Sequence, residues 1–320
     1  MPESSTDSQQ ERGLPAALTL PFKPPYDWRS LIAFLAPRAT PGVEIVSEGA
    51  YRRTIAFWGR VGTIRVQPAD EPATLLATIR FPLAAALPLI EQRLRHLFDL
   101  DADPSRIAAA LSSDPLMARL VATRPGLRLP GAWDAFELAV RAILGQQISV
   151  ARATTLAGRL VALCGTPLDA NDPHLDRLTH LFPTAIQLAR TDDLGLALGM
   201  PRARAAAITA LAKAAAADTN LLEPCPGAEE SLARLRQLPG IGEWTAQYIA
   251  MRAFHLPDAF PHSDIGLLRA MKTPAGRPTP SRLLARAAAW QPWRAYAAMH
   301  LWASASHQPR ATRRRKGNAA

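Results

Sequence analysis

Asp264, Trp244 and Trp302 are the residues with the clearest potential for chemistry. Asp264 lies in the segment FPHSDIGLLRAM, twenty residues after Trp244. A carboxylate can stabilise positive charge that develops in a transition state, or accept a proton from an attacking water. On position alone, Asp264 also suits the N-cap of the helix that follows it. Trp302, which lies in a helical pattern, is on its spacing alone more typical of a core residue.

The segment LRQLPGIGEWTA, residues 235–246, joins two helical patterns through a tight turn. Gly240 and Gly242 let the backbone adopt conformations closed to other residues and approach a partner closely. The helix that follows begins with unpaired N–H groups and the positive end of its dipole. Such a turn can bind a phosphate through main-chain atoms, and would hold DNA without reading its base sequence.

This turn has two other interpretations. A dinucleotide-binding fingerprint would require a third glycine and a preceding strand, and the sequence has neither, so we exclude it. An ordinary glycine at a helix C-terminus would explain the G-x-G pair by itself. The two glycines alone therefore do not decide between a phosphate-binding turn and an ordinary helix C-terminus. The residues around them are needed for that decision.

Length and composition predict a globular cytoplasmic protein. The chain has 320 residues, of which 48% are hydrophobic, which is enough for two or three domains with their own cores. No uncharged run approaches the roughly 18 apolar residues of a membrane span, and the first residues lack a secretory signal pattern. Cys164 and Cys225 are too few for a disulfide framework, a zinc ribbon or an iron–sulfur cluster.

The charge balance favours a polyanionic partner such as nucleic acid. The formal net charge is +10 and the pI is near 10.5. Only four of the 37 basic residues are lysines. The planar guanidinium group of arginine suits phosphate recognition, but a GC-rich genome would produce the same arginine bias, so composition alone does not decide.

The hydrophobic pattern predicts an α+β fold with an antiparallel sheet in its first part. Between residues 43 and 81 the stretches VEIVS, YRRTIAFW, VGTIRV and LLATIRF are rich in β-branched and aromatic residues and are separated by turn residues. Helical spacing predicts one helix around residues 28–36 and another over residues 87–98. These elements form one α+β domain.

Beyond residue 103 the strand signals stop, and the pattern predicts an all-α region. The expected helices cover residues 134–144, 150–164, 194–198, 202–216, 228–238, 245–254, 264–271 and 293–304.

The expected domain organisation has four parts. The polar composition of the first residues predicts a disordered leader. The basic end of the chain is more typical of a solvated terminus than of a dedicated DNA tether. The four parts are the leader 1–16, the α+β domain 17–112, the all-α region 113–306 and the tail 307–320.

The string L-P-G-I-G-x-W-T-A resembles the helix-hairpin-helix motif of base-excision DNA glycosylases, in which the hairpin is followed by a catalytic aspartate. Within that superfamily the chain resembles the 3-methyladenine DNA glycosylase II family, the AlkA type, from about residue 18 to residue 309. The segments that carry the resemblance are PPYDW (24–28), RPGLRLPG and WDAFELAVRAILGQQISV (124–150), LGMPRARA (198–205), the hairpin, and WQPWRAYAAMHLW (290–302).

This resemblance implies an architecture and a set of site residues. The N-terminal domain should be similar to half of a TATA-binding protein, followed by helical parts with the DNA cleft between them. Asp264 would be the catalytic carboxylate, and no cofactor would be required. The other implied positions are Trp244, Tyr248, Trp302 and Phe34 in the base pocket; Gly240, Gly242 and Thr245 at a DNA phosphate; and the carbonyls of Arg236, Leu238 and Gly240 around a structural alkali ion such as Na⁺.

The implied reaction is hydrolysis of the bond between an alkylated purine and its deoxyribose. Because a base inside a duplex is out of reach, the nucleotide must rotate out and a side chain must fill the gap. N-alkylation makes a purine cationic and a good leaving group, and an aromatic cage attracts it by about 0.5–2 kcal/mol. One carboxylate could then suffice where sugar hydrolases use two. The expected partner is double-stranded DNA, bound by a monomer without a nucleotide cofactor.

Two positions depart from the family pattern. Gln147 stands where a leucine fills the gap left by the flipped base, and Ala303 stands where a tyrosine follows the pocket tryptophan. Gln147 is our candidate for the gap-filling side chain, although a polar residue there could instead cap a helix end. A larger pocket without the tyrosine should select for charge and leaving ability rather than for one base edge.

Relatives that also cut the DNA backbone carry a lysine just after the second hairpin glycine. Trp244 occupies that region here, and no lysine lies between Lys213 and Lys272, so the hairpin has no nucleophile for Schiff-base chemistry. Two other functions remain open on the sequence. They are a non-catalytic helix-hairpin-helix DNA-binding protein and a glycosylase for oxidised or deaminated purines.

Overall fold

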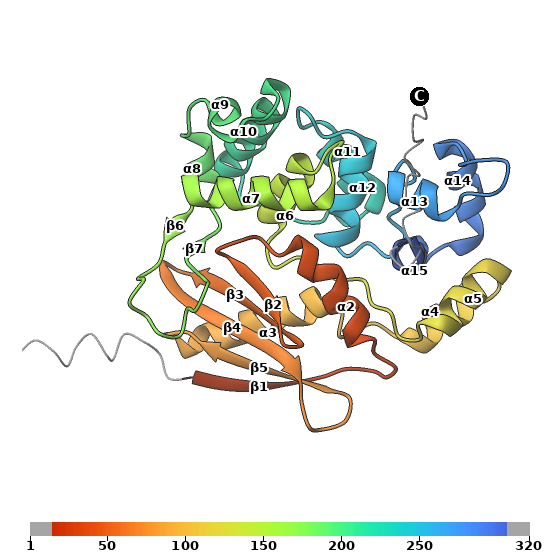
Figure 1. The fold of residues 1–320 in the computed structure, drawn as a ribbon, viewed down its shortest axis with the longest axis horizontal. Coiled ribbons are helices and arrows are strands. Elements are labelled where there is room, and N and C mark those ends of the chain that lie inside the picture. The colour runs from red at the N-terminus through yellow and green to blue at the C-terminus, as the bar shows by residue number, and fades with distance from the viewer. Residues whose placement is uncertain (1–14, 306–320) are drawn as a thin grey trace, which may run out of the picture.

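A computed structural model describes residues 15–305 as a sheet domain joined to a larger helical part. In Figure 1 the sheet lies below the helices, with the chain passing from one part to the other through α4 and α5. Most of the leader predicted for residues 1–16 and the tail predicted for residues 307–320 lie outside the described residues. None of the described helices is long and apolar enough to cross a membrane.

The sheet is antiparallel and has five strands in the order β1-β5-β4-β3-β2. Its side chains alternate, as in β5, where Leu75, Ala77 and Ile79 are buried between half-buried neighbours. The buried face packs against the helices α2 and α3 and closes one hydrophobic core. The elements are β1 (Pro15–Pro21), α2 (Trp28–Leu35), the 3-10 turn η1 (Ala36–Arg38), β2 (Glu44–Ser47), β3 (Ala50–Phe57), β4 (Arg60–Pro68), β5 (Thr74–Arg80), η2 (Ala84–Ala86) and α3 (Leu87–Phe98).

The predicted α+β class is confirmed, but strand β1 was missed. Residues 15 and 16, which the sequence placed in the leader, pair with Arg80 and Ile79 of β5. The strand lies at the edge of the sheet and has a proline at each end, and such a segment carries a weak strand signal. Its alternation is visible only once β5 supplies a partner.

The helical part forms a second core of its own. The predicted helices are all present, and α7 and α9 have the predicted bounds. Side-chain caps fix several starts, because Asp134, Ser149 and Asp264 each accept a backbone N–H three residues on. The helices are α4 (Pro104–Leu111), α5 (Pro115–Thr123), α6 (Ala135–Leu144), α7 (Val150–Cys164), α8 (Ala185–Ala189), α9 (Leu194–Leu198), α10 (Arg202–Ala217), α11 (Ala228–Arg236), α12 (Glu243–Arg252), α13 (Ile265–Ala270), α14 (Pro280–Ala287), η3 (Ala288–Trp290) and α15 (Arg294–Ala305).

The region beyond residue 103 is not purely helical, which corrects the sequence-based expectation. Strands β6 (Thr166–Pro167) and β7 (His180–Leu181) form a small antiparallel pair. With two residues each, they are too short to show alternation. Strand β7 packs along the large sheet, where Thr54 Oγ1 of β3 donates to the His180 carbonyl at 2.8 Å. The sequence also missed the helices α4, α5, α8 and α14.

The predicted boundary after residue 112 falls between α4 and α5 and stays a prediction. Ile107 and Leu111 of α4 pack in the helical core, which favours a boundary nearer residue 103.

A buried charge network joins the sheet to α6. Arg141 Nη1 lies 2.9 Å from a carboxylate oxygen of both Glu44 and Glu137, and Arg53 Nη2 lies 2.7 Å from Glu137. Burial acts to raise the pKa of Glu44, but Arg141 and Arg53 lower it to about 2. Removing one partner of such a buried pair typically costs about 3–5 kcal/mol, because a charge is left without compensation. The network therefore fixes the two parts to each other.

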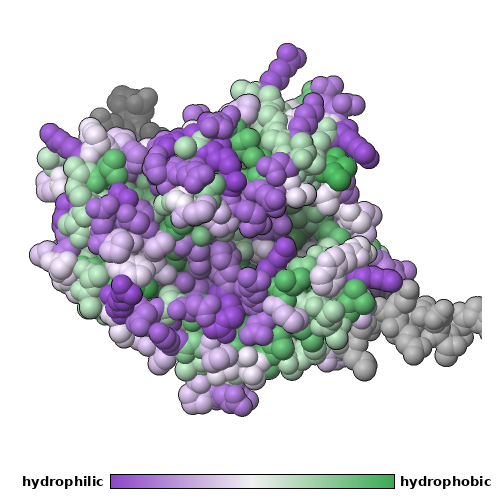
Figure 2. Space-filling model, turned by 180° about the vertical axis from the view of Figure 1, so that it is seen from behind, coloured by the Kyte–Doolittle hydropathy of each residue, from purple (hydrophilic) through white to green (hydrophobic). Residues whose placement is uncertain are grey.

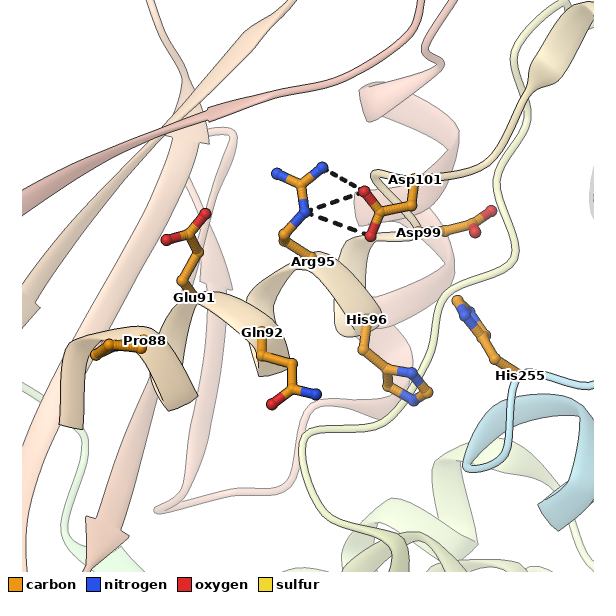
Figure 3. Close-up of a pocket in the computed structure, with 8 residues that line it drawn as sticks. All are labelled: Pro88, Glu91, Gln92, Arg95, His96, Asp99, Asp101 and His255. Atoms are coloured by element: carbon orange, nitrogen blue, oxygen red, sulfur yellow. Dashed lines mark hydrogen bonds and ion pairs between the residues drawn. The ribbon is translucent and has the colours of Figure 1, made fainter. Parts of the chain in front are cut away.

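One buried histidine, two half-buried histidines and one buried aspartate give the fold a pH dependence. His96 of α3 faces His255 in a cavity of about 470 Å³ (Figure 3), and their ring centroids are 4.4 Å apart. Burial lowers the pKa of His96, His255 and His300 to about 4. Burial raises the pKa of Asp99 to about 7, although hydrogen bonds from the Leu129 N–H and the Tyr296 hydroxyl act to lower it.

We predict that the free energy of unfolding falls steeply between pH 6.5 and 4. The unfolded chain protonates three histidines there that the folded chain keeps neutral, so their contribution is lost as the pH falls. Asp99 acts in the opposite sense, because its raised pKa gives stability that is lost as the pH rises. The net of about two protons corresponds to about 2.7 kcal/mol per pH unit near pH 5.

Urea unfolding at several pH values measures this slope. His300→Gln should make the slope shallower by about one proton, or about 1.4 kcal/mol per pH unit. A wild-type slope no steeper than that of His300→Gln would contradict the prediction.

Candidate functional site

The carboxylate of Asp264 lies where three segments of the helical part meet. Asp264 is the N-cap of α13, and its Oδ1 accepts the Leu267 N–H at 3.0 Å. The indole of Trp302, from α15, donates to the same oxygen at 2.9 Å. The indole of Trp244, from the first turn of α12, donates to Oδ2 at 3.0 Å. The capping role and a role for the carboxylate in a site are therefore compatible, and both predicted tryptophans hold it.

Gly266 allows this close approach, and the sequence analysis missed it. A Cβ at Gly266 would lie 2.8 Å from Asp264 Oδ1 and 3.1 Å from Cδ1 of Trp302. Any side chain there would push the carboxylate and the indole apart. The signal in the sequence is the spacing D-x-G, which has no meaning until the indole is known to pack against it.

The hairpin between α11 and α12 has the form that the sequence predicts. Gly240 has a left-handed φ of +80°, and a Cβ there would lie 2.3 Å from the Cβ of Ala207 on α10. Gly242 is the N-cap of α12, has no side-chain cap, and has no other atom within 4 Å of where its Cβ would be. The N–H groups of the first turn of α12 have no carbonyl partners within the helix. The turn therefore leaves room for an anion at the start of α12, and its role at a DNA phosphate stays a prediction.

Gln146 ties this hairpin to the turn between α6 and α7. Its Nε2 donates to the Gly240 carbonyl at 2.9 Å and to Thr245 Oγ1 at 3.0 Å. Thr245 is buried, so its side chain positions the hairpin, while its N–H lies in the first turn of α12. No local signal in the sequence points to Gln146, because its partners are almost a hundred residues away.

Gln147 is exposed and has a positive φ of 58° in the same turn. The N-cap of α7 is Ser149, whose side chain accepts the Arg152 N–H at 3.3 Å. Ser149 therefore fills the helix-capping role considered for Gln147. An exposed side chain beside the hairpin suits insertion into a duplex, and that role stays a prediction.

The four predicted pocket residues form one aromatic cluster. The rings of Trp244 and Tyr248 stack with centroids 5.4 Å apart at 10°. Tyr248 packs edge-on to Trp302 at 6.3 Å. Phe34, at the end of α2, stacks on Trp302 at 6.1 Å. The sheet domain therefore supplies one wall of the cluster and the helical part supplies the rest, with Asp264 bonded to two of the rings.

Two arginines that the sequence analysis missed contact the same rings. The guanidinium carbon of Arg38 lies 3.8 Å from the centre of the Phe34 ring, and that of Arg252 lies 4.9 Å from it. Arg252 Nη1 donates to the Tyr248 hydroxyl at 2.9 Å. Burial acts to raise the pKa of Tyr248, but the charges of Arg252 and Arg38 lower it below its ordinary value. The aromatic cluster therefore already borders two cations.

The three carbonyls expected at an alkali ion lie at the end of α11 and in the hairpin. The Leu238 carbonyl accepts the Ile241 N–H at 3.1 Å, and the Gly240 carbonyl accepts Gln146. A carbonyl oxygen has two lone pairs, so neither bond prevents a second contact. Neutral oxygens at a helix C-terminus fit a hard cation. The ion itself stays a prediction.

Charged and polar side chains cover much of the molecule. Figure 2, seen from behind, shows hydrophilic residues gathered over the centre of that face, with hydrophobic residues mainly toward its edges. Within residues 15–305 no cluster of three histidine, cysteine or acidic side chains is placed to hold a metal ion.

Two family models match the chain. The first, described as the AlkA N-terminal domain, matches residues 17–134. The second, described as the HhH-GPD superfamily of base excision DNA repair proteins, matches residues 140–295. Together they cover the sheet domain, the hairpin and Asp264.

Relatives match over nearly the whole chain. The "DNA-3-methyladenine glycosylase 2" of Escherichia coli K12 is 39% identical over 91% of this chain and 98% of its own length. A Mycobacterium tuberculosis protein described as a "probable bifunctional transcriptional activator/DNA repair enzyme AlkA" is 42% identical over 91% of this chain, but the chain spans only 57% of it. The structure of a 3-methyladenine DNA glycosylase from Archaeoglobus fulgidus superposes with a TM-score of 0.78 at 22% identity, covering 91% of this chain and 98% of that one.

Proposed function

We propose that this chain, which belongs to the DNA-3-methyladenine glycosylase 2 family of helix-hairpin-helix base-excision DNA repair proteins, hydrolyses the N-glycosidic bond of alkylated purines such as 3-methyladenine and 7-methylguanine. The observation that carries the proposal is the Asp264 carboxylate, bonded to the indoles of Trp244 and Trp302 within the aromatic cluster. A purine stacked on those rings would bring its sugar close to the carboxylate.

Asp264 would act on the sugar. Departure of the base leaves positive charge on the anomeric carbon, and a carboxylate held in place before the reaction stabilises that charge without reorganising. The two carboxylate oxygens offer about four acceptor positions, and three are occupied by N–H donors. The remaining position can face the sugar or accept a proton from the attacking water.

The aromatic cluster would hold the extruded base, with selection shared between ring stacking and leaving ability. The ring faces attract a cationic purine by about 0.5–2 kcal/mol. Arg38 and Arg252, which border the same rings, repel it. We therefore expect the weak glycosidic bond of an N-alkylated purine to contribute more to selection than the sequence alone suggested.

The hairpin would grip the phosphate backbone beside the flipped nucleotide, and Gln147 would fill the space that the base leaves. Gly242 has open space around it at the start of α12, which suits backbone N–H contacts to a phosphate. We further propose that the chain acts on double-stranded DNA as a monomer, needs no nucleotide cofactor, and works in the cytoplasm with the nucleoid.

Two other functions remain as candidates. A non-catalytic DNA-binding protein would have no use for a carboxylate with two indole donors. A glycosylase for oxidised or deaminated purines could share the same cluster, since guanidinium groups can donate hydrogen bonds to a base carbonyl. Assays of base release separate the three.

The first test replaces the carboxylate. Asp264→Asn should lower single-turnover release of 7-methylguanine from duplex DNA by at least about 100-fold, the usual effect of removing a key electrostatic stabiliser. DNA binding should persist, because the hairpin is unchanged. Asp70→Asn, at an exposed position of the sheet domain, is the control. Near-normal release by Asp264→Asn would exclude the proposed role.

A second test separates ring stacking from hydrogen bonding. Trp302→Phe keeps an aromatic ring but removes the N–H that reaches Asp264, and the loss of a hydrogen bond to a charged group predicts a rate about 10- to 100-fold lower. Trp28→Phe removes an indole bond to the Gly49 carbonyl in the sheet domain and should leave the rate unchanged. Equal rates for the two variants would show that the indole bond does not position the carboxylate.

The third test concerns the DNA backbone. Because Trp244 stands in the region where a lysine nucleophile would be needed, the reaction should leave an intact strand with an abasic site. Borohydride, which traps Schiff bases, should give no covalent complex between this chain and damaged DNA. A trapped complex at Lys213, Lys272 or any other lysine would contradict a purely hydrolytic reaction.

A further inference from the structure

The face of the sheet that points away from α2 and α3 carries a row of arginines. Alternation along the strands places Tyr51, Ile64 and Ile79 in the core and their neighbours on the other face. Three neighbouring strands each contribute one arginine to that outer face: Arg52 from β3, Arg65 from β4 and Arg80 from β5. None of the three lies in the hairpin or the aromatic cluster.

The strand register brings these arginines close together. Arg52 pairs directly with Arg65, and Arg65 pairs with Thr78, two residues before Arg80. Directly opposed side chains have Cβ atoms about 5 Å apart and diagonal ones about 7–8 Å apart. Like charges directly opposite each other destabilise a sheet. Asp176 compensates the charge of Arg52 within this chain, so Arg65 and Arg80 are the arginines of this row whose charge an added anion would compensate.

The segment between β6 and β7 turns this face into a groove. His174 and Leu178 of that segment form a wall above the arginines, and the enclosed space is about 500 Å³. The segment is fixed beside the sheet, because the Thr179 and His180 N–H groups both donate to the carbonyl of Gly42, in the turn before β2, at 2.8 and 3.0 Å. The other lining residues are Thr63, Ile64, Gln67 and Thr78.

The groove carries more positive than negative charge. Arg52 is bonded to Asp176 at 2.8 Å. Arg65 donates from Nε to the Gln67 side chain at 3.1 Å, which leaves its terminal nitrogens for other partners. Among residues 15–305, neither Arg65 nor Arg80 has a carboxylate within 4.0 Å. Guanidinium groups flanked by threonine hydroxyls match phosphate oxygens in charge and in hydrogen bonding.

We propose that this groove is a second DNA-binding surface, in which Arg65 and Arg80 contact backbone phosphates of a duplex segment that does not occupy the hairpin. Several phosphates follow one another along a DNA strand, and a row of cations along a groove fits such an array better than it fits a single anion. The surface contacts the DNA backbone and not the base edges, so binding there does not depend on the base sequence. It holds the protein on DNA through the sheet domain while the hairpin and the aromatic cluster engage another site.

The experiment counts how many short duplexes one chain binds and measures how the affinity for DNA depends on salt. A 10-base-pair undamaged duplex is too short to occupy two separate surfaces, so at low salt the wild type should bind two copies, counted by native mass spectrometry. Arg65→Gln with Arg80→Gln should bind one. On a 40-base-pair duplex, the slope of log affinity against log salt should fall by about 1.8 in the double variant, since each phosphate contact contributes about 0.9.

The matched control removes the same amount of positive charge from another part of the surface. Arg119→Gln with Arg282→Gln removes two exposed arginines from α5 and α14 and should keep two duplexes per chain and the wild-type slope. Release of 7-methylguanine from a 10-base-pair substrate should be the same in both double variants, because neither alters the catalytic site. If the proposed function is wrong, 7-methylguanine is not released by either variant, while the number of duplexes bound per chain is unaffected.

One duplex per wild-type chain, or equal salt slopes in the two double variants, would overturn the proposal. Tight binding of an acidic peptide by the wild type, lost in Arg65→Gln with Arg80→Gln while the duplex count stays at two, would also overturn it, because the groove would then be a protein-binding surface.

Discussion

The Asp264 carboxylate accepts three N–H bonds that come from three different segments: the start of α13, the hairpin helix α12 and the last helix α15. A carboxylate can stabilise developing charge only if it is already in place, so these segments must be fixed relative to one another. Contacts in the helical part fix these segments. Gly266 leaves space for the carboxylate and the indole, and Gln146 ties the hairpin to the turn after α6. The proposed phosphate site and the proposed catalytic group therefore share one rigid frame.

The sheet domain is attached to this frame by buried charges rather than by its hydrophobic core alone. Arg141 bonds Glu44 and Glu137, and its Nη2 also donates to the carbonyl of Arg38. The same contacts hold η1 and the end of α2 in place, so Phe34 reaches the Trp302 ring. Buried ion pairs seldom add net stability compared with apolar packing, but they fix one geometry. Here that geometry completes the aromatic cluster from two domains.

The arginines that carry the positive charge lie in three different environments. Arg252 is buried and bonded to Tyr248 and to the carbonyls of Pro130 and Gly131, so it is part of the frame. Arg38 is less buried and stacks on Phe34 beside the cluster. Arg65 and Arg80 lie on the outer face of the sheet, where no described carboxylate neutralises them. A net charge of +10 therefore says little by itself, because its effect depends on which arginines are buried against partners and which face solvent.

Elements with local signals could be predicted from the amino-acid sequence. Periodicity and caps gave α3, α7 and α9 at their observed bounds, and the string around Gly240 and Gly242 gave the hairpin, because glycine geometry and helix caps depend on neighbouring residues. Features that depend on distant partners became visible only in the folded chain. Strand β1 required β5, and the pair β6–β7 required the sheet beneath it. Gln146 and Gly266 gained their roles from contacts across up to about a hundred residues. Asp264 could be named from the sequence, but the two indoles that hold it come together only when α12 and α15 pack around α13.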